Sequence, residues 1–123
     1  MADIDVVGPE FAATHRYARI SPRKARLVAD LIRGLDCREA LDVLAFTHQR
    51  AARLVEAVLK SAMANADEQE ADMKRLFVKE ARIDGGPYFR RFRPKDRGRA
   101  HPIAKFTSHI VVKVAEPDQE LKR

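Results

Sequence analysis

A strongly basic segment between two strand-like runs constrains the fold of this chain more than any other feature. Residues 85–106 contain seven Lys or Arg side chains and one acid, Asp96, which gives the segment a local charge of +6. Strand signals fade after Asp84 and return near Ile103, which leaves about twenty residues between the two runs. Loops of this length are uncommon in compact domains unless they are functional or disordered. The segment therefore predicts the far end of a hairpin that joins two antiparallel strands.

The same segment contains the residues of a tight turn. Pro94 fixes its own φ, Asp96 favours the start of a turn, and Gly98 tolerates a positive φ. If both arms of the hairpin stay paired, about ten residues on each side at roughly 3.3 Å per residue give a finger about 30 Å long. Such a finger has no core of its own and its charges repel one another, so we expect an anionic partner to surround it.

Periodic apolar residues predict the remaining elements. Helices are expected at residues 20–34, 36–46 and 47–66. Strands are expected at residues 75–84 and 104–114, with a weaker one at 11–20. This order predicts an α+β fold in which three helices pack on a small three-stranded antiparallel sheet, with a long protruding β-hairpin.

The 123 residues are expected to form a single domain. Its expected parts are an N-terminal extension (1–10), a globular core (11–84 and 103–115), an extended basic hairpin end (85–102) and a C-terminal tail (116–123).

Local signals place the ends and faces of the helices. Ser21 is expected to cap the first helix, Pro22 to occupy its first position and Gly34 to stop it. Asp36 and Glu39 have the spacing of a capping box for the second helix. The third helix is expected to begin near Thr47. The apolar stripe of the first helix is expected to consist of Leu27, Val28, Leu31 and Ile32.

Alternation predicts which strand residues face the core. In the run 75–84 the inward set is expected to be Phe77, Ala81 and Ile83, with Lys79 breaking the pattern. In the run 104–114 it is expected to be Phe106, Ser108, Ile110, Val112 and Val114.

A second basic segment indicates the class of partner. Residues 15–33 contain six basic side chains and one acid, Asp30, a local charge of +5, while the whole chain carries only +6. The residues outside the two basic segments are therefore acidic on balance. Two concentrated positive segments on a mildly acidic body favour a polyanion, and nucleic acid is the commonest one. The alternative is a solvated charged face with no partner.

Other classes of protein are disfavoured by what the sequence lacks. Cys37 is the only cysteine, so neither a disulfide nor a cysteine-cluster metal site is expected. The protein is therefore expected to reside in a reducing cytoplasm. We expect Cys37 to be a core residue. No apolar run approaches the roughly 18 residues of a membrane span, and no secretory signal is recognised at the start. Phosphate-binding and hydrolase motifs are missing and the four histidines are scattered, so we expect no enzyme, no metal and no cofactor.

Four motifs give the chain a resemblance to a known family. "RISPRKARLVADLIRG", "KSAMANA", "GPYFRRFRPKDRGRAHPI" and "TSHIVV" occur in the order found in large-subunit ribosomal protein twenty-two, the bacterial L-twenty-two family. The resemblance covers roughly residues 11–115. It implies a cytoplasmic ribosomal protein that binds large-subunit ribosomal RNA, supports assembly and contacts neighbouring ribosomal proteins. It further implies that the hairpin lines the exit tunnel beside the protein-four loop and meets the nascent polypeptide.

The resemblance and the charge pattern give one set of candidate RNA contacts. The set consists of Arg16, Arg19, Arg23, Lys24, Arg26, Arg90, Arg91, Arg93, Lys95, Arg97, Arg99, Lys105 and His109. The tip that would reach the tunnel contains Pro94, Asp96 and Gly98. The chain departs from the family where Lys95-Asp96 replaces an arginine followed by alanine, and where Phe106 takes an often basic position.

A free-standing module that binds single-stranded RNA or DNA away from the ribosome is the alternative function. Tyr88, Phe89 and Phe92 could stack on unpaired bases, as aromatic platforms do. The long unsupported finger favours a permanent scaffold around it, and therefore the ribosome.

Overall fold

Strand β3 forms the centre of the sheet, and the other strands pair with it on either side. The computed structural model describes residues 10–94 and 100–117, with the side chains of residues 10–88 and 105–117. The strand order is β1-β3-β2, and both pairings are antiparallel. The elements are β1 (Glu10–Ala18), α1 (Pro22–Ile32), α2 (Cys37–Phe46), α3 (Arg50–Glu68), β2 (Phe77–Pro94) and β3 (Ala100–Ala115).

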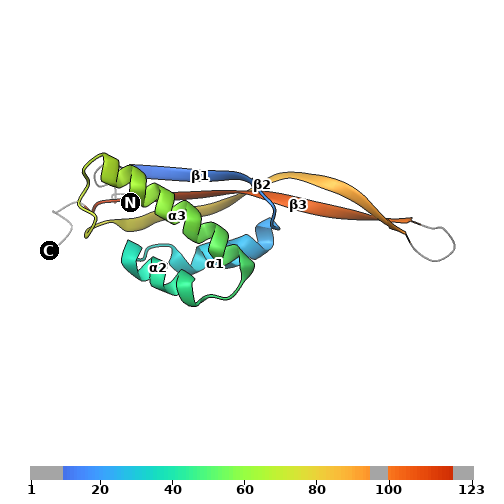
Figure 1. Cartoon of the computed structure of the whole chain (residues 1–123), viewed down its shortest axis with the longest axis horizontal. Helices are drawn as coiled ribbons and strands as arrows, with labels where there is room; N and C mark the ends of the chain where they lie inside the picture. The colour runs from blue at the N-terminus through green and yellow to red at the C-terminus, as the bar shows by residue number, and fades with distance from the viewer. Residues whose placement is uncertain (1–9, 95–99, 118–123) are drawn as a thin grey trace, which may run out of the picture.

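The three helices pack against this sheet in a body at one end of the molecule (Figure 1). α3 contacts β1 and β3, α1 contacts β2, and α2 packs mainly on the other two helices. This arrangement confirms the predicted α+β fold of three helices on a three-stranded antiparallel sheet. It also confirms the weak strand signal in the N-terminal run, which is β1.

One apolar core fills the space between the sheet and the helices. Buried alanines on the helices let the backbones approach one another closely. The largest fully buried apolar side chains are Val28, Ile32, Leu44, Val55, Leu59, Leu76, Val78, Ile110, Val112 and Val114.

Cys37 belongs to this core, as predicted. Burial, together with the neighbouring charge of Asp36, raises the pKa of its thiol to about 12. The thiol is therefore protonated at neutral pH, and it acts as a small apolar group rather than a nucleophile.

The buried face of α1 differs from the predicted stripe. Leu27 is 58% exposed and Leu31 is 48% exposed, so the prediction that they face the core is wrong. The helix instead buries Ala25, Val28, Ala29 and Ile32, which also follow a helical period. Two small residues on the buried face let α1 lie close to the sheet, which turns the larger leucines outward.

The inward face of β2 also differs from the prediction. Its register shifts between Val78 and Glu80, so that an extra residue opposes β3 at this point. Because a bulge changes the phase of the alternation, Val78 and Ala81 both face the core while Phe77 is only partly buried. Lys79, which broke the sequence pattern, is the extra residue.

The helix boundaries follow the local signals in α1 and depart from them in α2. The Ser21 hydroxyl accepts the Lys24 N–H at 3.4 Å, Pro22 is the first helical residue and Gly34 has φ 85°, all as predicted. The predicted capping box of α2 is wrong, because the Asp36 side chain makes no capping bond. Asp36 instead forms a backbone bridge with the start of β2.

The start of α3 lies later than predicted, at Arg50 rather than near Thr47. Thr47 closes α2, since its N–H and its hydroxyl both donate to the Val43 carbonyl.

β2 and β3 remain paired beyond the body and form the predicted protruding hairpin (Figure 1). We call the paired residues 88–94 and 100–106 the finger. Its register runs from Tyr88 opposite Phe106 to Pro94 opposite Ala100, and no described helix accompanies it. The predicted turn, with Asp96 and Gly98, lies outside the described residues.

We predict that the body folds without the finger. Because Tyr88 and Phe106 are direct partners, an Asn-Gly turn can replace residues 89–105 and keep their pairing. The core side chains lie outside the deleted segment. Circular dichroism melts of this variant should show one cooperative unfolding transition, and a broad, non-cooperative melt would place the finger in the core.

A second prediction concerns the glycine that ends α1. A Cβ at Gly34 would meet no atom within 4 Å, so the only cost of Gly34→Ala is its φ of 85°. We expect denaturant titration to show a loss of about 1 kcal/mol in unfolding free energy. Gly85→Ala is the matched control, because a Cβ there also meets open space and the φ is not positive. Equal losses in both variants would contradict the backbone explanation.

Candidate nucleic-acid interface

The root of the finger is where both basic segments meet. β2 shifts register between Gly85 and Tyr88 as it leaves the body, and the turn between β1 and α1 lies next to it. The buried Ser108 hydroxyl donates to the Ile20 carbonyl at 2.6 Å, which ties this turn to β3. The sequence separation of these two residues shows that the sheet, rather than local sequence, brings the two basic segments together.

Close packing fixes the path of β2 through the root. The buried Thr107 hydroxyl donates to the Pro87 carbonyl. A Cβ at Gly86 would lie 2.6 Å from the Thr107 hydroxyl oxygen and 3.3 Å from the His109 ring, so only glycine fits here without displacement. The strands therefore enter the finger in one arrangement.

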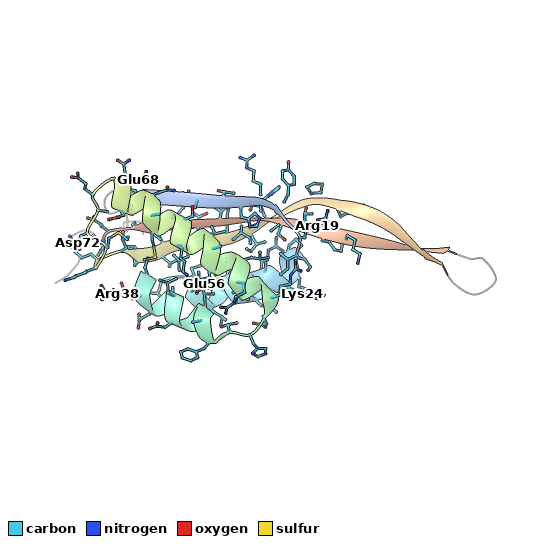
Figure 2. The ribbon with its side chains drawn as sticks, in the orientation of Figure 1. Arg19, Lys24, Arg38, Glu56, Glu68 and Asp72 are labelled. Carbon is cyan, nitrogen blue, oxygen red and sulfur yellow. The ribbon has the colours of Figure 1, made fainter. Side chains whose placement is uncertain are left out.

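Four cations surround a pocket of about 730 Å³ at this root. Arg19 lies in the turn between β1 and α1, and Lys24 lies in the first turn of α1. Arg50 is at the start of α3, and Lys105 is at the base of the finger. Among the described residues that line it there is no acid. We call this hollow the root pocket. Figure 2 shows Arg19 and Lys24 at the end of the body from which the finger leaves.

Acidic side chains concentrate elsewhere on the body. Glu68 and Asp72 lie at the end opposite the finger (Figure 2). On the sheet, Arg82 pairs with Glu80 and with Asp84, the latter at 3.3 Å. These ion pairs neutralise cations locally, whereas the root presents a concentrated positive potential.

The candidate residues of the first basic segment divide into two groups. Arg16, Arg19, Arg23 and Lys24 are all exposed near the root. Arg26 is also exposed, but its guanidinium donates twice to the Ile83 carbonyl, at 3.3 and 3.1 Å. Arg26 therefore braces α1 against β2, and part of its donor capacity is already used.

The candidates of the second segment are described to different extents. Lys105 is exposed at the base of the finger, beside the root pocket. For Arg90, Arg91 and Arg93 the structure gives the backbone, which lies in β2, and Pro94 is the last residue of that strand. The candidates Lys95, Asp96, Arg97, Gly98 and Arg99 lie outside the described residues.

His109 has a structural role in addition to any contact with RNA. Its Nδ1 accepts the Tyr17 N–H at 3.1 Å, and the two rings meet edge to face at 4.9 Å. Tyr17 has φ 59°, a conformation that this bond helps to hold. Since Nδ1 is occupied as an acceptor, Nε2 is the ring nitrogen left to donate outward.

Two residues of the root were not among the sequence-based candidates. Arg50 lies within the third helix as expected from the sequence, but that helix was predicted to begin earlier, near Thr47, and the prediction gave Arg50 no role. Phe106 was expected to face the core, yet it is 50% exposed, and its ring lies 5.7 Å from that of its strand partner Tyr88. No local signal identifies either residue, since only the meeting of α1, α3 and the finger places them on one pocket.

The described residues contain no group of three metal-ligating side chains. Within the same part of the chain, no helix has the length and apolar character needed to cross a membrane. The groups gathered at the root are cations, the starts of α1 and α3, and half-exposed apolar side chains.

Comparisons with known proteins identify the family of the chain. The family model described as Ribosomal protein L22p/L17e matches residues 13–115. The "Large ribosomal subunit protein uL22" of Rubrobacter xylanophilus is 53% identical over 107 residues, which cover 86% of this chain and 84% of that protein. The protein of the same name in Geobacter sulfurreducens is 48% identical over 108 residues, which cover 87% of this chain and 97% of that protein. These matches confirm the resemblance drawn from the four motifs. The chain belongs to the ribosomal protein L22 family, whose members are structural constituents of the large ribosomal subunit rather than enzymes.

Proposed function

We propose that this protein binds large-subunit ribosomal RNA through the finger root and the finger, and that it supports assembly of the subunit. The observation that carries this proposal is the root itself, where cations from α1, α3 and β3 surround one pocket and the described part of its lining contains no acid. Membership of the family places the protein in the large subunit of the cytoplasmic ribosome. Ribosomal RNA and neighbouring ribosomal proteins are therefore its expected partners.

RNA phosphates suit this surface for electrostatic reasons. Each cation that neutralises a phosphate releases condensed counterions, which makes binding favourable and dependent on salt. The acidic residues at the opposite end of the body would be repelled by RNA. This polarity orients the protein with the root and finger in the RNA and the end with Glu68 and Asp72 away from it.

The finger is proposed to line the tunnel through which the nascent polypeptide leaves the ribosome. Its paired strands extend seven residues beyond the body, from Tyr88 to Pro94 in β2, which corresponds to about 20 Å at ~3.3 Å per residue. A narrow two-stranded element can enter a space that a globular body cannot. The tip residues Pro94, Asp96 and Gly98 are proposed to lie at the tunnel wall, next to the nascent chain.

A free-standing single-strand-binding module is the second candidate function. Tyr88 and Phe106, which are 48% and 50% exposed, form a ring pair that could stack on unpaired bases. Family membership favours the ribosome, and sedimentation of tagged protein in a lysate separates the two functions. The tagged chain should migrate almost wholly with large subunits, and a mainly free pool would support the second function.

We predict that cations at the root contribute phosphate contacts. Changing Arg19, Arg23 and Lys24 together to Gln should weaken binding of the protein to large-subunit ribosomal RNA. The slope of log K against log salt should shrink by roughly 0.7 to 0.9 for each lost contact, hence by about 2 to 3. Arg26 is left unchanged because it braces the body.

The control for this variant removes the same charge far from the root. Arg38, Lys60 and Lys74 are exposed and lie outside the lining of the root pocket. Their combined change to Gln should leave the salt slope nearly unaltered. If both triple variants shift the slope equally, the effect is one of net charge and the root makes no specific contacts.

A further inference from the structure

We propose that the root pocket holds one unstacked nucleotide of the bound RNA. Its phosphate would lie among Lys24, Arg50 and Lys105, and its base would pack against Leu27 and Phe106. This inference rests on the proposed RNA-binding function and adds a defined site to it. The pocket volume, about 730 Å³, lies within the range of roughly 300–1,000 Å³ typical of sites for small molecules.

The start of α3 supplies a first reason to place a phosphate here. This helix is 19 residues long, has no acid in its first turn, and its N-cap residue Gln49 makes no side-chain capping bond. Its positive end is therefore compensated by no carboxylate of its own first turn. Gln49 and Arg50 both line the root pocket, so the helix dipole and the Arg50 charge favour an anion at the same place.

Charge complementarity supplies a second reason. Three cations in the lining, Lys24, Arg50 and Lys105, come from α1, α3 and β3, and no acid is among the described residues that line the pocket. Gathering these charges in one hollow is unfavourable without an anion, and an RNA phosphate is the anion that the proposed partner brings.

The apolar part of the lining points to a base in addition to a phosphate. Leu27 and Phe106 are large apolar side chains that remain 58% and 50% exposed at this pocket. A fully paired duplex hides its bases between two rows of phosphates and could not reach these side chains. An unstacked base can cover them, and stacking on a phenylalanine ring is a common way for proteins to bind unpaired RNA.

The walls of the pocket are held in place without a ligand. The Arg53 guanidinium donates to the carbonyls of Leu44 and Thr47, the latter at 2.8 Å, and so fixes the turn before α3. On the other side, the Ser108 hydroxyl fixes Ile20, which lines the pocket. Binding therefore requires little reorganisation of the backbone.

The role of the ring is tested by comparing Phe106→Ala with Phe46→Ala. Both phenylalanines are exposed, at 50% and 89%, but only Phe106 lines the root pocket. With full-length protein and protein-free bacterial large-subunit ribosomal RNA, Phe106→Ala should weaken affinity about tenfold, as expected for the loss of one base stack. Phe46→Ala should leave affinity nearly unchanged, and Phe106→Ala should not weaken binding of a fully paired RNA duplex. Equal losses in the two variants on the ribosomal RNA, or a tenfold loss for Phe106→Ala on the duplex, would overturn the assignment of the base.

The role of the phosphate is tested by comparing Arg50→Gln with Arg38→Gln. Both arginines are exposed in the first turn of a helix, so each change has a similar effect on helix stability. Arg50→Gln should reduce the slope of log K against log salt by about 0.7, the value for one contact with a single strand, and Arg38→Gln should not. Indistinguishable slopes would show that no phosphate occupies the pocket.

Failure of this inference can be told apart from failure of the proposed function. If the unaltered protein binds the ribosomal RNA in a salt-dependent manner but the pocket variants behave like their controls, the RNA-binding function stands and the pocket assignment falls. If the unaltered protein shows no salt-dependent affinity for the RNA, both fall together.

Discussion

One strand belongs to both the body and the finger, and the rest of the structure depends on this sharing. β3 pairs with β1 and β2 within the body and continues with β2 alone from Phe106 to Ala100. Because Ile110, Val112 and Val114 fix the strand in the core, the packing of the body sets the direction in which the finger leaves it. A finger attached through a separate loop would need its own contacts to acquire a direction. Here, the buried hydroxyls of Thr107 and Ser108 complete the transition from body to finger.

Structural features that depend on a few neighbouring residues could be predicted from the sequence, and features that depend on packing between distant segments could not. Ser21 and Gly34 act on their own helix through one hydrogen bond and one dihedral angle, so they mark the ends of α1 correctly. Leu27 looked like a core residue because its spacing is helical, but the rotation of α1 depends on which face has the alanines that fit the sheet. The alternation in β2 failed at Lys79 for a similar reason, since the bulge exists only opposite β3.

The candidate site shows the same division between local and distant causes. Exposed cations such as Arg19 and Lys24 were identified from the charge pattern and the family resemblance, because a cluster of like charges and a motif are both visible in the sequence. The bond from Arg26 to the Ile83 carbonyl joins residues far apart in the chain, so the charge pattern gave no indication that this arginine braces the body. Arg50 reaches the pocket only because α3 begins beside the finger.

The strand order has a consequence for the time at which the protein can fold. β1 pairs with β3, so Glu10 lies opposite Ala115, a partner about 100 residues later in the chain. Local hydrogen bonds can form the helices early, but the sheet that covers their apolar faces requires β3, which is synthesised after all three helices. Closing contacts of such long range is slow, and the helices keep apolar surface exposed until it happens. The core can therefore close only after β3 has been made, and both basic segments are synthesised before the body that orients them exists.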